Sequence, residues 1–249
     1  MMIRRFVFFA LLAMLGPGLA FAQSAESEPE TGDALTEQLR SMQPEESTEI
    51  SGVLKIRSPK RREEIPVVFR IVTNGSSWLV IYETRSTTNR AAEKLVVIRS
   101  VNQPNKYLYA RAPAPNAPLS EPKPLAAAEA STPFAGSDFW LTELGFEFLR
   151  WPIQHKLPGE MRLGQPCYVL ESINPDAPLV VRVKSWVEKE SGGLLIAEAY
   201  DRNKKMVKEF SLAGSSFKKI NGRWQLKKMK ISSPQEKSET VLEFDLPKD

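Results

Sequence analysis

The chain has 249 residues, of which 42% are hydrophobic and 26% charged, and its formal net charge is +4 at pH 7. These values are ordinary for a soluble globular chain, and so small a positive excess gives no reason to expect a nucleic acid as partner. The single cysteine, Cys167, excludes an internal disulfide. The fold must therefore be stabilised by a hydrophobic core of its own, which this length permits.

The first 22 residues have the pattern of a cleaved secretory signal. Two arginines precede an apolar run over residues 6–19, and Ala20-Phe21-Ala22 fits the small-x-small rule for cleavage. The alternative is a membrane anchor, but the run is short and interrupted for a helix that spans a bilayer. We therefore expect an exported, periplasmic protein that begins at Gln23, with an acidic, disordered tether over residues 23–32.

A short helix is expected after the tether. Asp33 can serve as its N-cap, and Leu35, Leu39 and Met42 then share one face. Pro44 cannot continue a helix and marks its end.

Beyond this helix the hydrophobic period changes to two, which is typical of β-strands. Turn signals such as Asn74-Gly75 separate the apolar runs and favour antiparallel hairpins. Eleven segments qualify as strands: Ile50–Arg57, Ile65–Ile71, Trp78–Glu83, Ala92–Val101, Tyr107–Arg111, Cys167–Ser172, Leu179–Val187, Leu194–Tyr200, Met206–Leu212, Trp224–Ile231 and Thr240–Leu246.

Several of these strands are apolar on both faces. In the third strand, Trp78, Val80 and Tyr82 alternate with Leu79 and Ile81. A single sheet with one wet face does not need this pattern. A half-closed barrel with apolar residues in its mouth would account for strands that are apolar on both faces. A β-sandwich, which is the alternative, would also account for them.

Residues 112–133 are rich in proline and alanine and cannot form a ladder strand. We interpret this segment as a long loop within one domain that spans residues 33–249. The alternative is a boundary between two smaller domains.

The stretch Phe134–Trp151 follows this loop and is strongly apolar. Within it, Trp140, Leu144, Phe148 and Trp151 recur at helical spacing. The pattern predicts a short helix, preceded by a turn at Gly136-Ser137-Asp138, that lies against the apolar face of the sheet.

From Phe134 to Leu246 the chain resembles the LolA-like outer-membrane lipoprotein-sorting proteins. Five pieces in the same order carry the resemblance: Gly136-Ser137-Asp138-Phe139, residues 164–171 (GQPCYVLE), residues 184–189 (KSWVEK), residues 198–208 from Glu198-Ala199-Tyr200-Asp201 to Lys208, and Ile220-Asn221-Gly222-Arg223-Trp224. The amino-terminal half shows no matching motif, and the proline-rich segment lies where the family is usually shorter. No gating arginine can be carried over; Arg70 is the one candidate position that we offer.

The resemblance implies a mainly β fold, in which a curved antiparallel sheet of about eleven strands forms an unclosed half-barrel and short helices cover its apolar concave face. It also implies a monomeric periplasmic carrier that binds the acyl chains of lipoproteins or lipids for sorting to the outer membrane. Its partners would be acylated lipoproteins or lipid and transport proteins of the inner and outer membranes. The alternative function is a ligand-free interaction module that serves an envelope export system.

A carrier of this kind needs an apolar cavity and a lid, and aromatic residues of the predicted strands and helix are candidates for both. We expect the helix to act as the lid, although each residue could equally be ordinary core. The candidates are Phe69, Trp78, Val80, Tyr82, Tyr107, Tyr109, Phe139, Trp140, Leu144, Phe148 and Trp186.

Nothing in the sequence indicates catalysis, a metal or a cofactor. His155 is the only histidine, which excludes a His-rich metal site. Cys167 lies in an apolar strand and is interpreted as a buried structural thiol. Glu143 and Glu147 have the spacing of paired carboxylates, but we interpret them as a solvated face opposite Trp140.

One basic cluster remains. It is interpreted as a solvated surface, with docking to an anionic membrane or an acidic partner as the alternative. Its members are Lys218, Lys219, Arg223, Lys227, Lys228 and Lys230.

Overall fold

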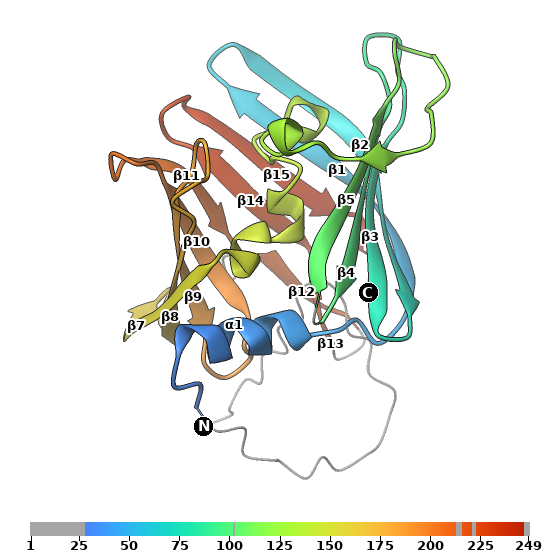
Figure 1. Ribbon diagram of the computed structural model, residues 1–249. Coiled ribbons are helices and arrows are strands. Elements are labelled where there is room, and N and C mark those ends of the chain that lie inside the picture. Colours follow the sequence, from blue (N-terminus) through green and yellow to red (C-terminus); the bar gives the residue numbers. More distant parts are fainter. Residues whose placement is uncertain (1–27, 102, 213–215, 221–222, 247–249) are drawn as a thin grey trace.

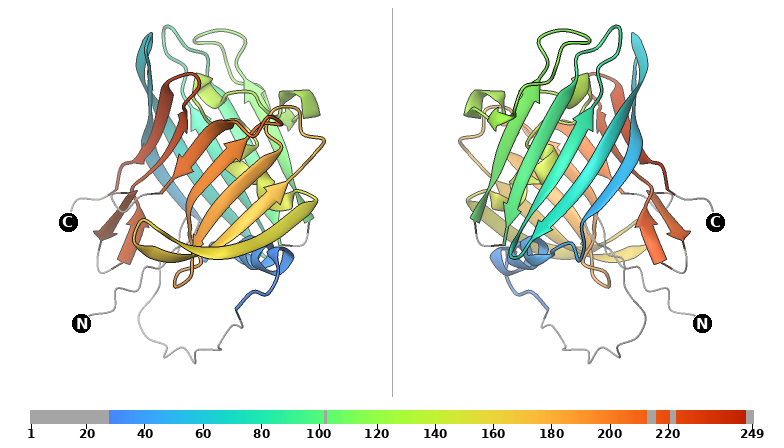
Figure 2. Two further views of the ribbon diagram at one scale, coloured as in Figure 1. Left: turned by 90° about the vertical axis from the view of Figure 1, so that its left-hand side faces the viewer. Right: turned by 90° about the vertical axis from the view of Figure 1, so that its right-hand side faces the viewer.

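The computed structural model describes residues 28–101, 103–212, 216–220 and 223–246. Within these ranges a single antiparallel sheet of thirteen strands curls into a half-barrel that does not close (Figure 1). The two side views show the strands of both walls tilted across the axis of the half-barrel (Figure 2). The expected mainly β, unclosed half-barrel is confirmed, and the β-sandwich alternative is wrong because every wall belongs to the same sheet.

The order of strands in the sheet joins the two ends of the chain. In sheet order the strands are β6 (Lys123–Pro124), β5 (Gln103–Arg111), β4 (Glu93–Ser100), β3 (Ser77–Thr84), β2 (Arg61–Asn74), β1 (Thr48–Ser58), β15 (Ser238–Phe244), β14 (Lys228–Ser233), β11 (Met206–Ser211), β10 (Leu194–Tyr200), β9 (Arg182–Glu188), β8 (Gln165–Ile173) and β7 (Ile153–Arg162). A separate hairpin consists of β12 (Phe217–Ile220) and β13 (Arg223–Leu226). The amino-terminal β1 pairs with the carboxy-terminal β15, so the back wall contains both halves of the sequence.

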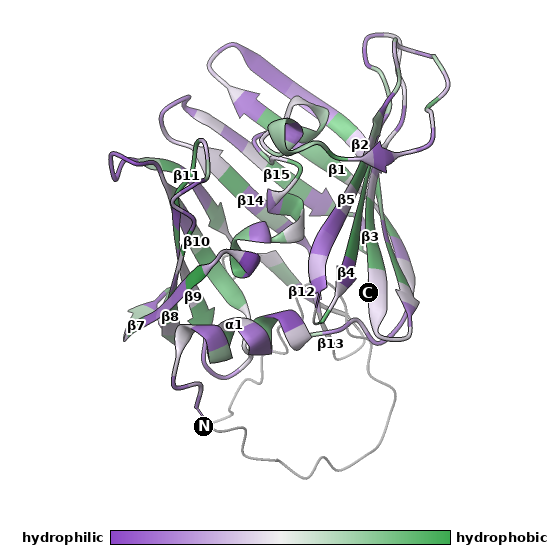
Figure 3. Ribbon diagram, viewed as in Figure 1, coloured by the Kyte–Doolittle hydropathy of each residue, from purple (hydrophilic) through white to green (hydrophobic). Residues whose placement is uncertain are grey.

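The concave side of β1–β4 is filled by the core. Along β3 the side chains of Trp78, Val80 and Tyr82 are buried, and the residues between them are half-buried on the outer side. The Phe69 ring of β2 lies 5.2 Å from the Tyr82 ring and 5.5 Å from that of Phe244. Figure 3 shows hydrophobic and hydrophilic positions alternating along the strands of both walls. This part of the concavity is packed around Phe69 and Tyr82.

The positions of the two edge strands require the chain to cross the open side of the half-barrel. Because β5 and β6 lie at one edge and β7 at the other, residues 125–152 must traverse the open side of the half-barrel (Figure 1). We call this stretch the crossing segment. It carries four short 3-10 turns: η1 (Ala127–Glu129), η2 (Phe134–Gly136), η3 (Glu143–Gly145) and η4 (Glu147–Arg150).

The single helix predicted over Trp140–Trp151 is therefore wrong. Phe146 adopts a left-handed conformation with φ of 51°, which ends η3 and redirects the chain into η4. A right-handed helix cannot pass through such a residue. As a result the four apolar side chains do not share one face: Leu144 packs in the main core, whereas Trp140, Phe148 and Trp151 pack on β9 and β10.

The predicted amino-terminal helix is present as α1 (Gly32–Ser41), although its cap is not Asp33. Thr31 is the N-cap, because its hydroxyl accepts a hydrogen bond from the Ala34 amide at 3.1 Å. The helix lies across one end of the half-barrel, where Leu35 and Leu39 pack with residues of η4, β8 and β9 (Figure 1).

The structure describes the predicted tether only from Glu28 onward. Lys156 donates a hydrogen bond to the Pro29 carbonyl at 2.6 Å, and Glu28 forms an ion pair with Lys189 at 3.0 Å. The predicted signal peptide and its predicted cleavage site lie outside the described residues. Among the described residues, no helix is long and apolar enough to cross a bilayer.

Gly145 provides a test of the crossing segment. A Cβ at this position would lie 2.3 Å from the Tyr107 hydroxyl oxygen. Because the strand cannot retreat, we expect Gly145→Ala to lower the free energy of unfolding by about 1–3 kcal/mol. Urea denaturation measures this loss.

The control is the same substitution in a Tyr107→Phe background. Removal of the hydroxyl relieves part of the overlap, so alanine should then cause a smaller loss. Strictly additive losses in the double variant would contradict a contact between these two residues.

Candidate functional site

The main cavity lies between the crossing segment and the wall formed by β9, β10 and β11. Its volume is about 320 Å³. Most of the lining is apolar, and it comes from the crossing segment, from the β8–β9 loop and from inward-facing strand positions. The lining includes Phe139, Trp140, Phe146, Phe148, Trp151, Pro178, Leu179, Val180, Val183, Ala197, Ala199, Phe210 and Ile231.

The sequence explains why this wall is hollow and the opposite wall is filled. Inward positions of β2 and β3 carry large side chains such as Phe69 and Tyr82, whereas β10 presents Ala197 and Ala199. Because the alanine side chains end at Cβ, they leave space that the aromatic residues of the crossing segment, which pack against this cluster, do not fill completely. Space for a ligand therefore remains beneath Trp140 and Phe148.

A buried ion pair lies at the cavity wall. The ammonium of Lys208, on β11, lies 2.8 Å from the Glu143 carboxylate and 3.5 Å from the centre of the Trp140 ring. Glu143 also accepts a hydrogen bond from the Trp140 amide at 2.7 Å. The Lys208 side chain is only 6% exposed. This arrangement fixes the Trp140 ring between a cation and the cavity.

Burial perturbs both members of this pair. Loss of solvent raises the pKa of Glu143, and Lys208 opposes that shift only in part. Loss of solvent likewise lowers the pKa of Lys208 against the pull of Glu143. The interpretation of Glu143 and Glu147 as a solvated face is wrong. Glu147 is also shielded, and it accepts hydrogen bonds from Tyr107 at 2.8 Å and Asn105 at 3.1 Å.

Asp138 fastens the crossing segment to the back wall. Its carboxylate accepts hydrogen bonds from the hydroxyls of Thr240, at 2.7 Å, and Ser238, both on β15. The Asp138 carbonyl accepts a further bond from Lys208 at 2.7 Å. The residue was expected only to start a helix, and its role as an anchor depends on partners about a hundred residues later, which no local pattern reveals.

The opposite wall holds the crossing segment through hydrogen bonds to the backbone of that segment. Arg90 donates to the Ala135 carbonyl at 2.8 Å, and the buried Glu93 accepts from the Ala135 amide at 2.8 Å. Farther along, Tyr82 donates to the Leu144 carbonyl at 3.4 Å and Tyr107 to the Thr142 carbonyl at 3.2 Å. The crossing segment is thus tied to both walls along its length.

The structure divides the predicted ligand-binding residues into three groups. Phe139, Trp140 and Phe148 line the main cavity. Six lie in the packed core away from it, namely Phe69, Trp78, Val80, Tyr82, Leu144 and Trp186. Tyr107 and Tyr109 are half-buried at the margin of that core.

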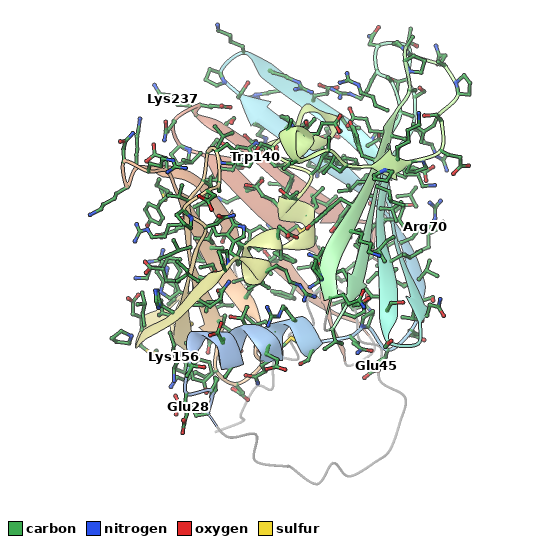
Figure 4. The ribbon with its side chains drawn as sticks, viewed as in Figure 1. Glu28, Glu45, Arg70, Trp140, Lys156 and Lys237 are labelled. Carbon is green, nitrogen blue, oxygen red and sulfur yellow. The ribbon has the colours of Figure 1, made fainter. Side chains whose placement is uncertain are left out.

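Lys208, Ala197 and Ala199 were missed as site residues. A signal for the alanines was present, since they recur with period two on one face of the predicted strand Leu194–Tyr200. Arg70 is remote from the cavity and forms ion pairs with Glu49 and Glu83. Figure 4 shows Trp140 in the mouth of the half-barrel and Arg70 on the outer side of the wall.

Features that could support other chemistry are sparse in the described part of the chain. It contains no cluster of three or more His, Cys, Asp or Glu residues suited to a metal ion. Cys167 is 1% exposed, and burial raises the pKa of its thiol, as expected for a structural cysteine. In the basic cluster, Lys227 lies 3.7 Å from Glu243 and Lys230 lies 3.2 Å from Glu239.

Three solved structures share this fold. A DUF1329 family protein from Desulfovibrio piger superposes with a TM-score of 0.69 at 18% identity, covering 86% of this chain and 90% of that one. A putative outer membrane lipoprotein-sorting protein domain from Vibrio parahaemolyticus gives 0.67 at 18% identity, covering 86% and 89%. A LolA superfamily protein from Nitrosomonas europaea gives 0.54 at 16% identity, covering 87% and 95%.

A protein-family model with the description "Uncharacterized protein" matches residues 87–248, which is more than half of the chain. The chain belongs to this family. A search of curated proteins gave no match. The expected LolA-like resemblance is confirmed in the fold, which the chain shares with the lipoprotein-sorting domain and the LolA superfamily protein.

The motifs that carry the LolA-like resemblance serve definite structural roles. Gly136, with φ of 63°, and Asp138 belong to the fastened part of the crossing segment. Gly164, with φ of 77°, forms the turn between β7 and β8, where its left-handed backbone suits glycine. Ala199 belongs to the fourth motif and supplies part of the cavity wall.

Removal of Lys208 should make stability depend strongly on pH. Lys208→Met leaves the Glu143 carboxylate buried and unpaired, so we expect the free energy of unfolding to fall by about 3–5 kcal/mol at pH 7. Because burial raises the pKa of Glu143 above its usual 4.5, the folded state holds a proton that the unfolded state releases. Stability therefore declines as pH rises above that value, and the loss should be much smaller at pH 4.

Urea denaturation of both proteins at pH 4 and pH 7 tests this expectation. Lys230→Met is the control, because it removes an exposed ion pair with Glu239 and should change stability by less than about 1 kcal/mol. A loss in Lys208→Met that is the same at both pH values would show that Glu143 is not the source.

Proposed function

We propose that this protein is a periplasmic carrier whose main cavity binds an acyl chain of a lipoprotein or lipid during sorting to the outer membrane. The observation that carries the proposal is the hollow of about 320 Å³ beneath Trp140 and Phe148. A concave hollow lined mainly by apolar side chains is the expected form of a ligand site.

The energetics favour such a ligand. Burial of an acyl chain releases about 0.8 kcal/mol for each methylene group, so even a partly enclosed chain is bound against transfer to water. The volume of about 320 Å³ lies near the lower end of the range for small-molecule sites. It suits one chain better than several.

The β8–β9 loop provides an entrance. Ala177, Pro178 and Leu179 line the cavity, and Leu179 is 50% exposed. An apolar side chain that is half in water at the rim of an apolar cavity offers a first contact for an incoming chain. In this proposal the chain enters beside the loop, and the crossing segment remains fastened at Asp138 and Ala135. The role of the crossing segment as a moving lid stays a prediction.

The family relationship supports the same function. The Vibrio relative is described as an outer membrane lipoprotein-sorting protein domain, and the amino-terminal residues have the pattern of an export signal. A carrier in the periplasm would receive its cargo from a protein at the inner membrane and release it to one at the outer membrane. The alternative is an interaction module that binds no ligand and serves an export system.

The carrier and the interaction module differ in whether the cavity accepts a ligand. N-phenyl-1-naphthylamine, an uncharged dye that fluoresces in apolar sites, should bind the wild-type protein and be displaced by a diacylated lipopeptide. We expect Ala199→Phe to weaken dye and lipopeptide binding by at least tenfold, because the ring fills the space above β10.

Ala128→Phe is the control, because Ala128 is exposed on η1 and does not line the cavity. Thermal unfolding of both variants confirms that they are folded before binding is compared. Binding that survives in Ala199→Phe would place the ligand elsewhere. Absence of any dye or lipopeptide binding to the wild-type protein would favour the interaction module.

A further inference from the structure

A second cavity lies at the end of the half-barrel that α1 covers. Its volume is about 40 Å³, which is room for a small polar group but not for an acyl chain. Its wall contains residues of α1, η4, β10, β11 and the β12–β13 hairpin. The lining residues are Leu39, Met42, Arg99, Phe146, Leu149, Gly192, Gly193, Leu194, Phe210, Leu212, Phe217, Leu226 and Met229.

Arg99 is the only charged residue among these lining residues, and it is 9% exposed. It lies on β4 after Leu95 and Val97, with its side chain on the same inward face. Its Nε atom is buried without a hydrogen-bond partner, and the guanidinium forms no ion pair with any residue of the described ranges. The guanidinium lies over the Trp78 ring, with its central carbon 5.4 Å from the ring centroid.

In the described part of the chain, the charges near Arg99 are two cations and one acid. Arg40 donates to the Leu149 carbonyl at 3.2 Å, and Arg150 donates to the Ser100 carbonyl at 2.6 Å, so both cations are held close by. Burial lowers the pKa of Arg150, and the charges of Arg40 and Arg99 lower it further. Glu147 is the nearby acid, and Tyr107 and Asn105 already donate to its carboxylate.

A buried guanidinium remains charged and is unfavourable unless an anion or several acceptors compensate it. Proteins rarely leave such a group unpaired inside an apolar cavity. Around Arg99 the described residues supply positive neighbours and one carboxylate, that of Glu147, which attracts Arg99 without forming an ion pair with it. The unpartnered Nε atom therefore suits a further anion, and the small volume favours a planar carboxylate, which an arginine binds through two parallel hydrogen bonds.

The second cavity adjoins the main cavity. Phe146 and Phe210 line both, and their rings meet nearly at right angles with centroids 5.7 Å apart. Only this pair of rings separates the acyl-chain site from Arg99. Phe146 is also the residue with left-handed backbone between η3 and η4, a conformation that is unfavourable for a bulky side chain.

We propose that Arg99 binds the carboxylate of a long-chain carboxylic acid whose hydrocarbon chain extends into the main cavity past Phe146 and Phe210, whose rings move apart to admit it. This inference rests on the proposed carrier function and specifies the class of cargo. The ligand is an anionic single-chain amphiphile, because the charged group meets Arg99 while the chain meets the apolar lining.

The test compares dodecanoate with methyl dodecanoate at pH 8, where the acid is ionised and the ester is not. Calorimetry or displacement of N-phenyl-1-naphthylamine gives both affinities. We expect the wild-type protein to bind dodecanoate at least tenfold more tightly than the ester. Arg99→Met should abolish this preference and leave ester binding unchanged, since methionine retains an apolar side chain of similar length.

Arg70→Met is the matched control. Arg70 lies on the outer face of β2, where it pairs with Glu49 and Glu83, and it touches neither cavity. This variant should keep the full preference for the acid. Acetate is the control for a free anion, and its failure to displace the dye would show that the chain and the carboxylate are recognised together.

The wild-type comparison needs no variant and decides the proposal even if Arg99→Met fails to fold. Equal affinity of the wild-type protein for acid and ester would overturn the role of Arg99 while leaving the carrier function intact. A preference that survives in Arg99→Met would also overturn it. Failure of the wild-type protein to bind either ligand or a lipopeptide would overturn both proposals.

Discussion

Because the sheet stays open, the chain has to pass from one of its edges to the other across the concave side. Every feature of the site depends on that crossing. A stretch of chain in a barrel mouth brings backbone N–H and C=O groups into an apolar interior, where each needs a partner. Thr240, Glu93, Tyr82 and Tyr107 supply such partners from both walls. The polar groups in the concavity are therefore the means by which an irregular segment is held inside it.

The crossing also explains why one wall is filled and the other hollow. Large side chains of β2 and β3 meet Leu144 and Phe139, so that half of the mouth closes. On the other side the short side chains of Ala197 and Ala199 leave space next to the aromatic residues of the same segment. A closed core on one side stabilises the fold by burying apolar surface. The hollow on the other side can then remain without loss of the overall structure.

The sequence predicts the strands of the walls more accurately than the structure of the crossing segment. Alternation of Leu54 and Ile56 with charged residues along β1 shows directly which side chains face inward, because a strand has only two faces. The edge strand β7 was missed, since Pro158 and Gly159 break its pattern and one face has little to cover. The helix predicted around Leu144 failed for a different reason. Apolar residues also recur at helical spacing when successive short turns pack against two different surfaces. Which surface each residue contacts depends on the positions of the two walls, and these are not visible in the local sequence.

The same limit applies to the charges at the site. The period of β4 places Arg99 on the inward face with Leu95 and Val97, so the sequence alone could have marked it as a buried cation. What it could not show is whether a carboxylate faces that cation, because partners such as Glu143 for Lys208 come from distant segments. Two inward cations thus lie in one half-barrel, one paired and one without a counter-ion among the described residues. The paired cation, Lys208, fixes Trp140 at the main cavity, whereas Arg99 is left with its charge directed at an apolar space. Because of this contrast, we expect the charge of Arg99, more than the shape of the main cavity, to determine which cargo the protein binds.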